Sequence, residues 1–97
     1  MPFDPTYRRM LASFRQSPNW DSELDLEVLR KLWPSLVGDR LAEVMNLTAV
    51  HGSRVVINVP DLIWRRQLVK IRRDLLAKMN APWPTPWIKE IAFTHEN

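Results

Sequence analysis

Side chains that commonly carry out enzymatic chemistry are scarce in this 97-residue chain. There is no cysteine, and the two histidines, His51 and His95, do not stand with acidic residues at metal-ligand spacing. The only glycines, Gly38 and Gly52, cannot build a phosphate loop or a dinucleotide-binding turn, which need several glycines at fixed spacing. We therefore expect no catalytic residue, no metal site and no cofactor.

Acidic residues cluster once, between Asp21 and Glu27, and include Asp25. We place them in the exposed first turn of a helix, where negative charge is favourable because of the helix dipole. A solvated helix start is a poor setting for acid–base catalysis. These residues therefore indicate a binding protein and not an enzyme.

Basic side chains concentrate in one segment. Seven Lys and Arg residues and two acidic residues lie between Arg54 and Lys78, whereas the whole chain has 14 and 11. Such a stripe suits a phosphate backbone or an acidic protein surface, and the alternative is a solvated helix face. We predict a nucleic-acid-binding role for five of these residues: Arg65, Arg66, Lys70, Arg72 and Arg73.

Two pairs of these arginines recur seven residues apart on a long helix predicted from Leu62 to Met79. On a helical wheel, Arg65 and Arg72 fall between two apolar rows. Their guanidinium groups either reach solvent or acids of the preceding helix, or they form a ridge for phosphate or carboxylate. One row consists of Trp64, Leu68, Ile71 and Leu75, and the other of Leu62, Val69 and Leu76.

Trp83 and Trp87 lie in a proline-rich segment that predicts an extended, stiff connection. Their rings either fold back as a lid or stay partly exposed as contact anchors, since tryptophan is enriched at interface hot spots. We predict a partner-binding role for both. Trp33 and Trp64 lie in apolar rows and are expected in the core.

Helical periodicity predicts the elements that come before this region. One helix is expected over Pro5–Gln16, and a second begins at Asp21 and continues to Met45 with a kink or restart at Pro34. Each of the three main helices follows an aspartate that can cap its first turn. These residues are Asp4, Asp21 and Asp61.

Alternating apolar residues predict the strands. A hairpin is expected within Leu47–Val59 with its turn at Gly52 and Ser53, and a closing strand over Ile88–Phe93. The fold class is therefore α+β: two N-terminal helices, a β-hairpin, a long helix and a closing strand. We expect the helices to cover one face of a small three-stranded sheet.

The chain length predicts a single domain over residues 1–97, with a core of about 22–94 and an N-terminal helix within 1–17. The composition, 45% apolar and 26% charged, is ordinary for a globular domain. No run approaches the roughly 20 apolar residues of a membrane span, and the start does not resemble a signal peptide. We expect a cytoplasmic protein with no membrane partner.

Four stretches resemble the conserved blocks of a bacterial family. Leu32–Ala42 resembles its "W, VG, LA" signature, and Val55–Leu68 its "LxVxV, WxxxL" block. Leu75–Asn80 resembles its "LL, LN" helix end, and Ile88–Phe93 its "IxxIxF" strand. Each block is short, but together they occur in the family's order over about two-thirds of the chain.

On these blocks the chain is similar to the DciA-like proteins, whose globular domain is similar to a KH domain. The resemblance implies a non-catalytic adaptor in DNA replication that interacts with the replicative helicase DnaB and helps place it on DNA. It also implies weak binding to single-stranded or duplex DNA without sequence specificity. The alternatives are a stand-alone nucleic-acid-binding module and a protein-interaction or oligomerisation domain.

The sequence departs from these patterns at three points. The GxxG loop by which KH domains clamp nucleic acid is missing, since Asp39, Arg40 and Leu41 follow Gly38. The loop at 81–86 is richer in proline and tryptophan than the glycine-containing connection typical of the family. Family members also usually carry a basic extension beyond this domain, and contacts assigned to it are not carried over.

Overall fold

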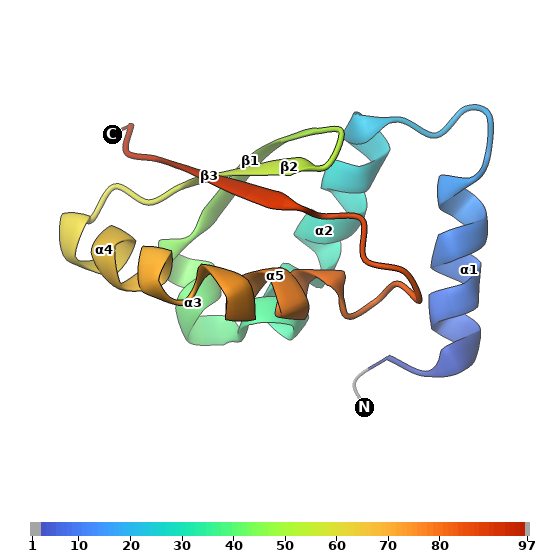
Figure 1. Cartoon of the computed structure of the whole chain (residues 1–97), viewed down its shortest axis with the longest axis horizontal. Coiled ribbons are helices and arrows are strands. Elements are labelled where there is room, and N and C mark those ends of the chain that lie inside the picture. The colour runs from blue at the N-terminus through green and yellow to red at the C-terminus, as the bar shows by residue number, and fades with distance from the viewer. Residues whose placement is uncertain (1–2, 97) are drawn as a thin grey trace.

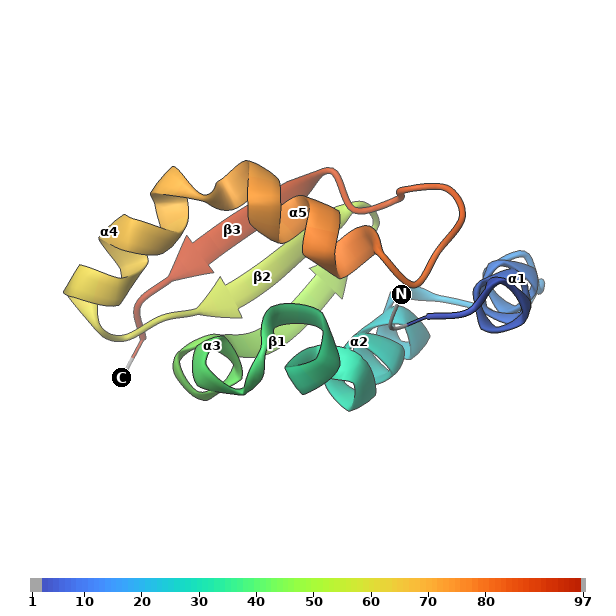
Figure 2. The ribbon, with the colours of Figure 1, turned by 90° about the horizontal axis from the view of Figure 1, so that it is seen from below.

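A computed structural model describes residues 3–96, and these form five helices and one three-stranded sheet. Helices α2 to α5 lie on one side of the sheet, while α1 stands at one end of the molecule (Figures 1 and 2). The predicted α+β class is confirmed. The elements are α1 (Pro5–Arg15), α2 (Ser22–Val37), α3 (Asp39–Val44), β1 (Asn46–His51), β2 (Arg54–Asn58), α4 (Leu62–Lys70), α5 (Arg72–Asn80) and β3 (Glu90–Thr94).

The sheet has the order β1-β2-β3. Strands β1 and β2 form the predicted antiparallel hairpin with its turn at Gly52 and Ser53, and β2 pairs in parallel with β3. A parallel neighbour requires a crossover, which α4 and α5 supply. The closing strand begins at Glu90, two residues later than expected, because the N–H groups of Lys89 and Glu90 both bond to the Ser53 carbonyl in the hairpin turn.

The core lies between the sheet and helices α2 and α5. Alternation along the strands buries Val55, Ile57 and Ile91, whereas Val56 between them is only half-buried. The inner residues meet fully buried side chains of the helices, among them Leu29 and Leu75. Each such burial stabilises the fold by roughly 1.5–3 kcal/mol, so this layer holds the helices on the sheet.

The three predicted aspartate caps are confirmed. The carboxylate of Asp4 accepts a hydrogen bond from the Tyr7 N–H, that of Asp21 from the Leu24 N–H, and that of Asp61 from the Trp64 N–H, at 2.9–3.0 Å. A cap of this kind contributes about 1 kcal/mol because it satisfies a donor that the helix itself leaves unpaired. The caps therefore set where α1, α2 and α4 begin.

A kink or restart of the helix was expected at Pro34, but the break lies four residues later, at Gly38. Helix α2 continues through Pro34 to Val37, and Gly38 separates it from α3. Gly38 has a φ of +92°, a conformation that glycine adopts without the clash a side chain would cause. Glycine and not proline therefore ends this helix.

The predicted long helix from Leu62 to Met79 is wrong, because it is two helices. Ile71 separates α4 from α5 with φ −108° and ψ 23°, and its N–H bonds to the Leu68 carbonyl at 3.1 Å, a 3₁₀-type turn. The two apolar rows are therefore not continuous. Leu68 and Leu75 are buried, but Leu62 and Val69 of the second row are 49% and 44% exposed.

Candidate functional site

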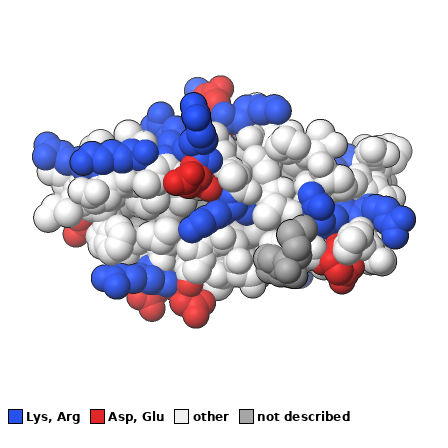
Figure 3. Space-filling model, turned by 60° about the horizontal axis from the view of Figure 1, so that its bottom comes forward, with Lys and Arg blue, Asp and Glu red and all other residues white. Residues whose placement is uncertain are grey.

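Helices α4 and α5 carry six of the 14 basic residues of the chain but only one acidic residue, Asp74. Figure 3 looks onto this side of the molecule, and Lys and Arg side chains gather over its upper left part. Within residues 3–96 none of these six basic residues forms an ion pair. We call the exposed members the basic face: Arg66, Lys70, Arg72, Arg73 and Lys78.

Arg65 does not belong to the basic face. It is half-buried, and its Nη1 donates a hydrogen bond to the Val59 carbonyl at 3.1 Å. Val59 follows β2 directly and is fully buried, so this bond ties the first turn of α4 to the end of the central strand. The guanidinium group forms no ion pair with an acid of the second helix, and the side chain remains partly exposed. Arg65 therefore has a structural contact that the helical wheel did not reveal.

Arg72 remains on the basic face. It is exposed, and its guanidinium carbon lies 5.6 Å from the centre of the Phe93 ring, a cation–π distance. Because Ile71 interrupts the helix, Arg66 and Arg72 lie on different helices. The expected straight ridge of two arginine pairs is therefore not formed, and the charges occupy a bent surface.

Apolar side chains are exposed beside these charges. Ile63 is 73% exposed, and its helix also exposes Leu62 and Val69. The helical wheel assigned Leu62 and Val69 to a buried row and did not consider Ile63. A helix that exposes several large apolar side chains next to positive charge can contact a protein as well as a phosphate backbone.

Trp83 and Trp87 fold back onto the domain. Their side chains are only 3% and 9% exposed, and their rings meet edge to face with centroids 5.3 Å apart. The proline-rich loop therefore adopts the lid arrangement, in which both rings fold back onto the domain. The partner-binding role of both residues stays a prediction, and in this arrangement both rings, including their indole nitrogens, are buried.

Asn80 holds this loop in place, a role that the sequence patterns did not predict. Its Oδ1 accepts hydrogen bonds from the N–H groups of Trp87 and Ile88, and its Nδ2 donates to the carbonyls of Leu76 and Ile88, all at 3.0 Å. One amide thereby joins the end of α5 to the segment that leads into β3. The only available signal was an asparagine at a helix end before a proline-rich stretch.

Helix α1 packs on the tryptophan loop through two arginines. Arg8 donates to the Trp83 carbonyl at 2.9 Å, and the Arg15 guanidinium lies 4.0 Å from the centre of the Trp87 ring. Arg15 also pairs with Asp25 at 2.9 Å. We call this contact between α1 and residues 81–87 the α1 seat.

Asp25 is buried, and its predicted exposure is therefore wrong. It is 3% exposed and accepts hydrogen bonds from the Arg15 guanidinium and from the Trp20 indole N–H, the latter at 2.7 Å. Its position in the first turn of α2 is as expected. Helix α1 and the residues that follow it cover this turn, and periodicity within α2 does not reveal that.

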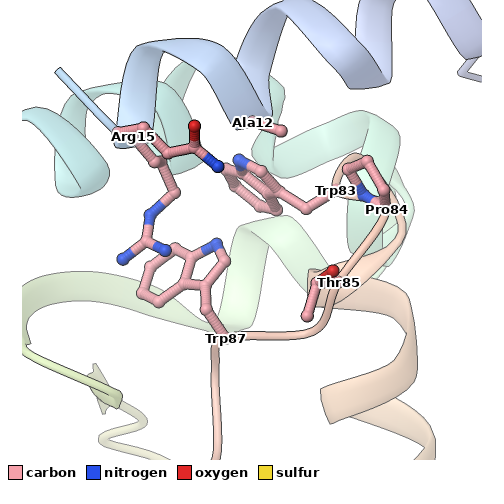
Figure 4. A pocket seen from close by; sticks show the side chains of 7 residues that line it. Ala12, Arg15, Trp83, Pro84, Thr85 and Trp87 are labelled. Atoms are coloured by element: carbon pink, nitrogen blue, oxygen red, sulfur yellow. The ribbon is translucent and has the colours of Figure 1, made fainter.

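A small pocket of about 150 Å³ opens in the α1 seat (Figure 4). The pocket is lined by side chains of α1 and of the tryptophan loop. They are Ala12, Arg15, Gln16, Trp83, Pro84, Thr85 and Trp87. No lining residue is acidic, and the one charged lining residue, Arg15, is paired with Asp25 outside the lining.

Metal sites and membrane spans are not found among residues 3–96. No three His, Asp or Glu side chains come together there in a way that could hold a metal ion. No described helix has the length and apolar character needed to cross a membrane. The basic face and the α1 seat remain as candidate binding surfaces.

Comparison with known proteins identifies the class. The fold is a small α+β domain with a basic face of five exposed Lys and Arg side chains. The family model described as "Dna[CI] antecedent, DciA" matches residues 6–93, nearly the whole chain. This chain therefore belongs to the DciA family, as its sequence blocks indicated. A search of the curated proteins finds no match.

Membership in this family implies a role in DNA replication in association with the DnaB helicase. The family consists of non-catalytic helicase adaptors, which agrees with the scarcity of catalytic side chains in the sequence. The expected association with the replicative helicase is confirmed at the level of the family.

Proposed function

We propose that this chain is a non-catalytic adaptor that helps place the replicative helicase on DNA and binds DNA weakly through its basic face. The observation that supports DNA binding is the group of exposed Lys and Arg side chains on α4 and α5 that have no acidic partner among the described residues. Because these side chains are exposed, they can approach a phosphate backbone without unfolding any part of the domain.

The chemistry of the basic face predicts the character of this binding. Phosphate contacts position a protein on nucleic acid and carry no base information, so no sequence preference is expected. Each neutralised phosphate of a duplex adds about −0.9 to the slope of log affinity against log salt concentration. Three contacts would give a slope of about −3 and weak affinity at physiological salt.

The test compares two triple variants of equal net charge. In the first, Arg66, Arg72 and Arg73 on the basic face become glutamine. In the second, three exposed basic residues elsewhere, Arg9, Lys31 and Lys89, become glutamine. Binding to single-stranded and duplex DNA is measured at two salt concentrations. We expect only the first variant to lose most of the salt dependence, and equal losses in both would contradict a defined DNA surface.

We further propose that the helicase contacts the exposed apolar side chains of α4. Ile63 is the most exposed large apolar residue described, and it lies on the helix that also carries Arg66. Replacing Ile63 with serine should weaken capture of the protein by immobilised helicase without lowering its stability. The matched control is Met10→Ser, since Met10 on α1 is 51% exposed. If the immobilised helicase captured both variants equally well, the exposed apolar side chains of α4 would be excluded as its contact surface.

Two finer features belong to the same proposal. The KH-like character of the fold is supported by a three-stranded sheet with helices on one face, without the GxxG loop. We therefore infer no KH-type clamping of RNA.

A cytoplasmic location follows from the replication role of the family. A stand-alone DNA-binding module would show the same salt dependence but no helicase capture.

A further inference from the structure

The α1 seat contains hydrogen-bond donors that no described residue satisfies. These are Nε1 of Trp83, Nε1 of Trp87 and Nε of Arg8. Both indoles are more than nine-tenths buried. An unpaired buried donor costs about 1–3 kcal/mol, and such groups are rare in folded proteins. Three of them at one contact between two elements make this contact a candidate site for an acceptor group of another molecule.

Two of these donors, Nε1 of Trp83 and Nε1 of Trp87, belong to residues that line the small pocket, whereas Arg8 does not line it. Figure 4 shows the indole nitrogens of Trp83 and Trp87 and the guanidinium of Arg15 around the same space. The walls are apolar ring faces together with Ala12 and Pro84. A ligand that fits this lining carries an acceptor group on a short apolar stem, and the nearby Arg15 guanidinium favours an acceptor with negative charge.

The protein already contains one group held in this manner. The Asp25 carboxylate accepts a hydrogen bond from an indole, that of Trp20, and two from the Arg15 guanidinium. The pocket has a related lining, in which the Trp83 and Trp87 indoles are unpaired donors and the Arg15 guanidinium already donates from Nε and Nη2 to Asp25. Charge-assisted hydrogen bonds of this kind are about twice as strong as neutral ones.

We propose that this pocket binds a carboxylate presented by a partner protein, from either an acidic side group or the C-terminus of the partner. Its volume of about 150 Å³ suits a carboxylate on a short aliphatic stem. A DNA phosphate, which has a sugar on each side, is too bulky to enter. Both indole nitrogens are shielded in the structure, so binding requires side chains of the pocket lining to move.

This site is independent of DNA binding by the basic face. Helix α1 and helix α4 lie at opposite ends of the molecule (Figures 1 and 2). Loss of one function therefore leaves the other measurable. In this proposal Trp83 and Trp87 bind the partner by donating hydrogen bonds from their indole N–H groups.

The five indole N–H signals of the 97-residue chain, followed by two-dimensional NMR, test this proposal. A blocked pentapeptide with one central glutamate should move the Trp83 and Trp87 signals in a saturable manner. The indoles of Trp20 and Trp33 already bond to Asp25 and to the Met45 carbonyl, so their signals should stay in place. The same peptide with glutamine, at equal ionic strength, should move none.

Further arms identify the source of the carboxylate. A peptide whose only carboxylate is its C-terminus is compared with the same peptide carrying a C-terminal amide, which tests whether a terminal carboxylate binds. Saturable shifts with the glutamate peptide or with the free C-terminal peptide support the site. Trp87→Phe should weaken peptide binding roughly tenfold or more, whereas the same change at Trp64, far from the pocket, should not. The absence of saturable shifts in the wild type, or equal shifts with a DNA oligonucleotide, would overturn the proposal.

Discussion

The two ends of this molecule use arginine in opposite ways. At the α1 end, Arg8 and Arg15 are bound by a backbone carbonyl, a carboxylate and an indole ring. On the basic face, Arg66 and Arg73 are exposed and have no acidic partner among the described residues. The first pair joins elements of the fold, and the second is free to bind another molecule. Net charge alone does not distinguish the two uses.

The same contrast holds for two ion pairs of similar length. Arg15 and Asp25 are 2.9 Å apart with side chains 28% and 4% exposed, whereas Arg54 and Glu90 are 3.3 Å apart with side chains 55% and 60% exposed. Water solvates the second pair and screens it, so it contributes little. The first shares its carboxylate with the Trp20 indole in a buried place, so removing one partner leaves others unsatisfied.

The largest effect is expected from Asp25→Ala. Loss of the carboxylate leaves the Trp20 indole and the Arg15 guanidinium without their acceptor, and we expect the free energy of unfolding to fall by about 3 kcal/mol. Urea unfolding of this variant and of Glu90→Ala, measured together, checks the comparison. Glu90→Ala should cost less than about 1 kcal/mol. Equal losses would mean that burial does not separate the two pairs.

A smaller loss is expected from Asn80→Ala. The variant leaves the N–H groups of Trp87 and Ile88 and the carbonyls of Leu76 and Ile88 without this partner, and about 2 kcal/mol of stability should be lost. Hydrogen exchange at Trp87 and Ile88 should also become faster, since their protection comes from Asn80. Asn46→Ala, at an exposed position in β1, serves as the control. Unchanged exchange in the Asn80 variant would show that the loop is held by its tryptophans alone.

Much of the fold could be predicted because its signals are local. The caps at Asp4, Asp21 and Asp61 and the hairpin turn each depend on a few neighbouring residues, and the structure confirms them. The break at Ile71 has no such signal. It lies at neither proline nor glycine, and a 3₁₀-type hydrogen bond to Leu68 marks it only once the protein is folded.

The candidate sites depended on information that the sequence does not hold. The exposure of Arg66 could be predicted from the helical wheel, since that residue faces away from both apolar rows. The contact of Arg65 could not, because its acceptor is a backbone carbonyl. The burial of Asp25 is likewise set by α1 and the residues after it, through Arg15 and Trp20. Sequence patterns thus located the charges, and tertiary contacts decided which of them are available.

The smallest and sharpest prediction compares neighbours on one helix. Arg65→Gln removes the hydrogen bond from α4 to the Val59 carbonyl and should lower the free energy of unfolding by about 1 kcal/mol. Arg66→Gln changes an exposed side chain and should stay within about 0.5 kcal/mol of the wild type.

DNA affinity should show the reverse order. Removing the free charge of Arg66 should reduce the salt slope by nearly one, whereas removing Arg65, whose guanidinium is already bonded, should change it little. Both variants lose one positive charge, so a general effect of net charge would alter the two slopes equally. Urea unfolding and DNA titration of the same two preparations decide between these outcomes. A larger DNA defect in Arg65→Gln than in Arg66→Gln would show that the half-buried arginine, and not the basic face, meets the phosphate backbone.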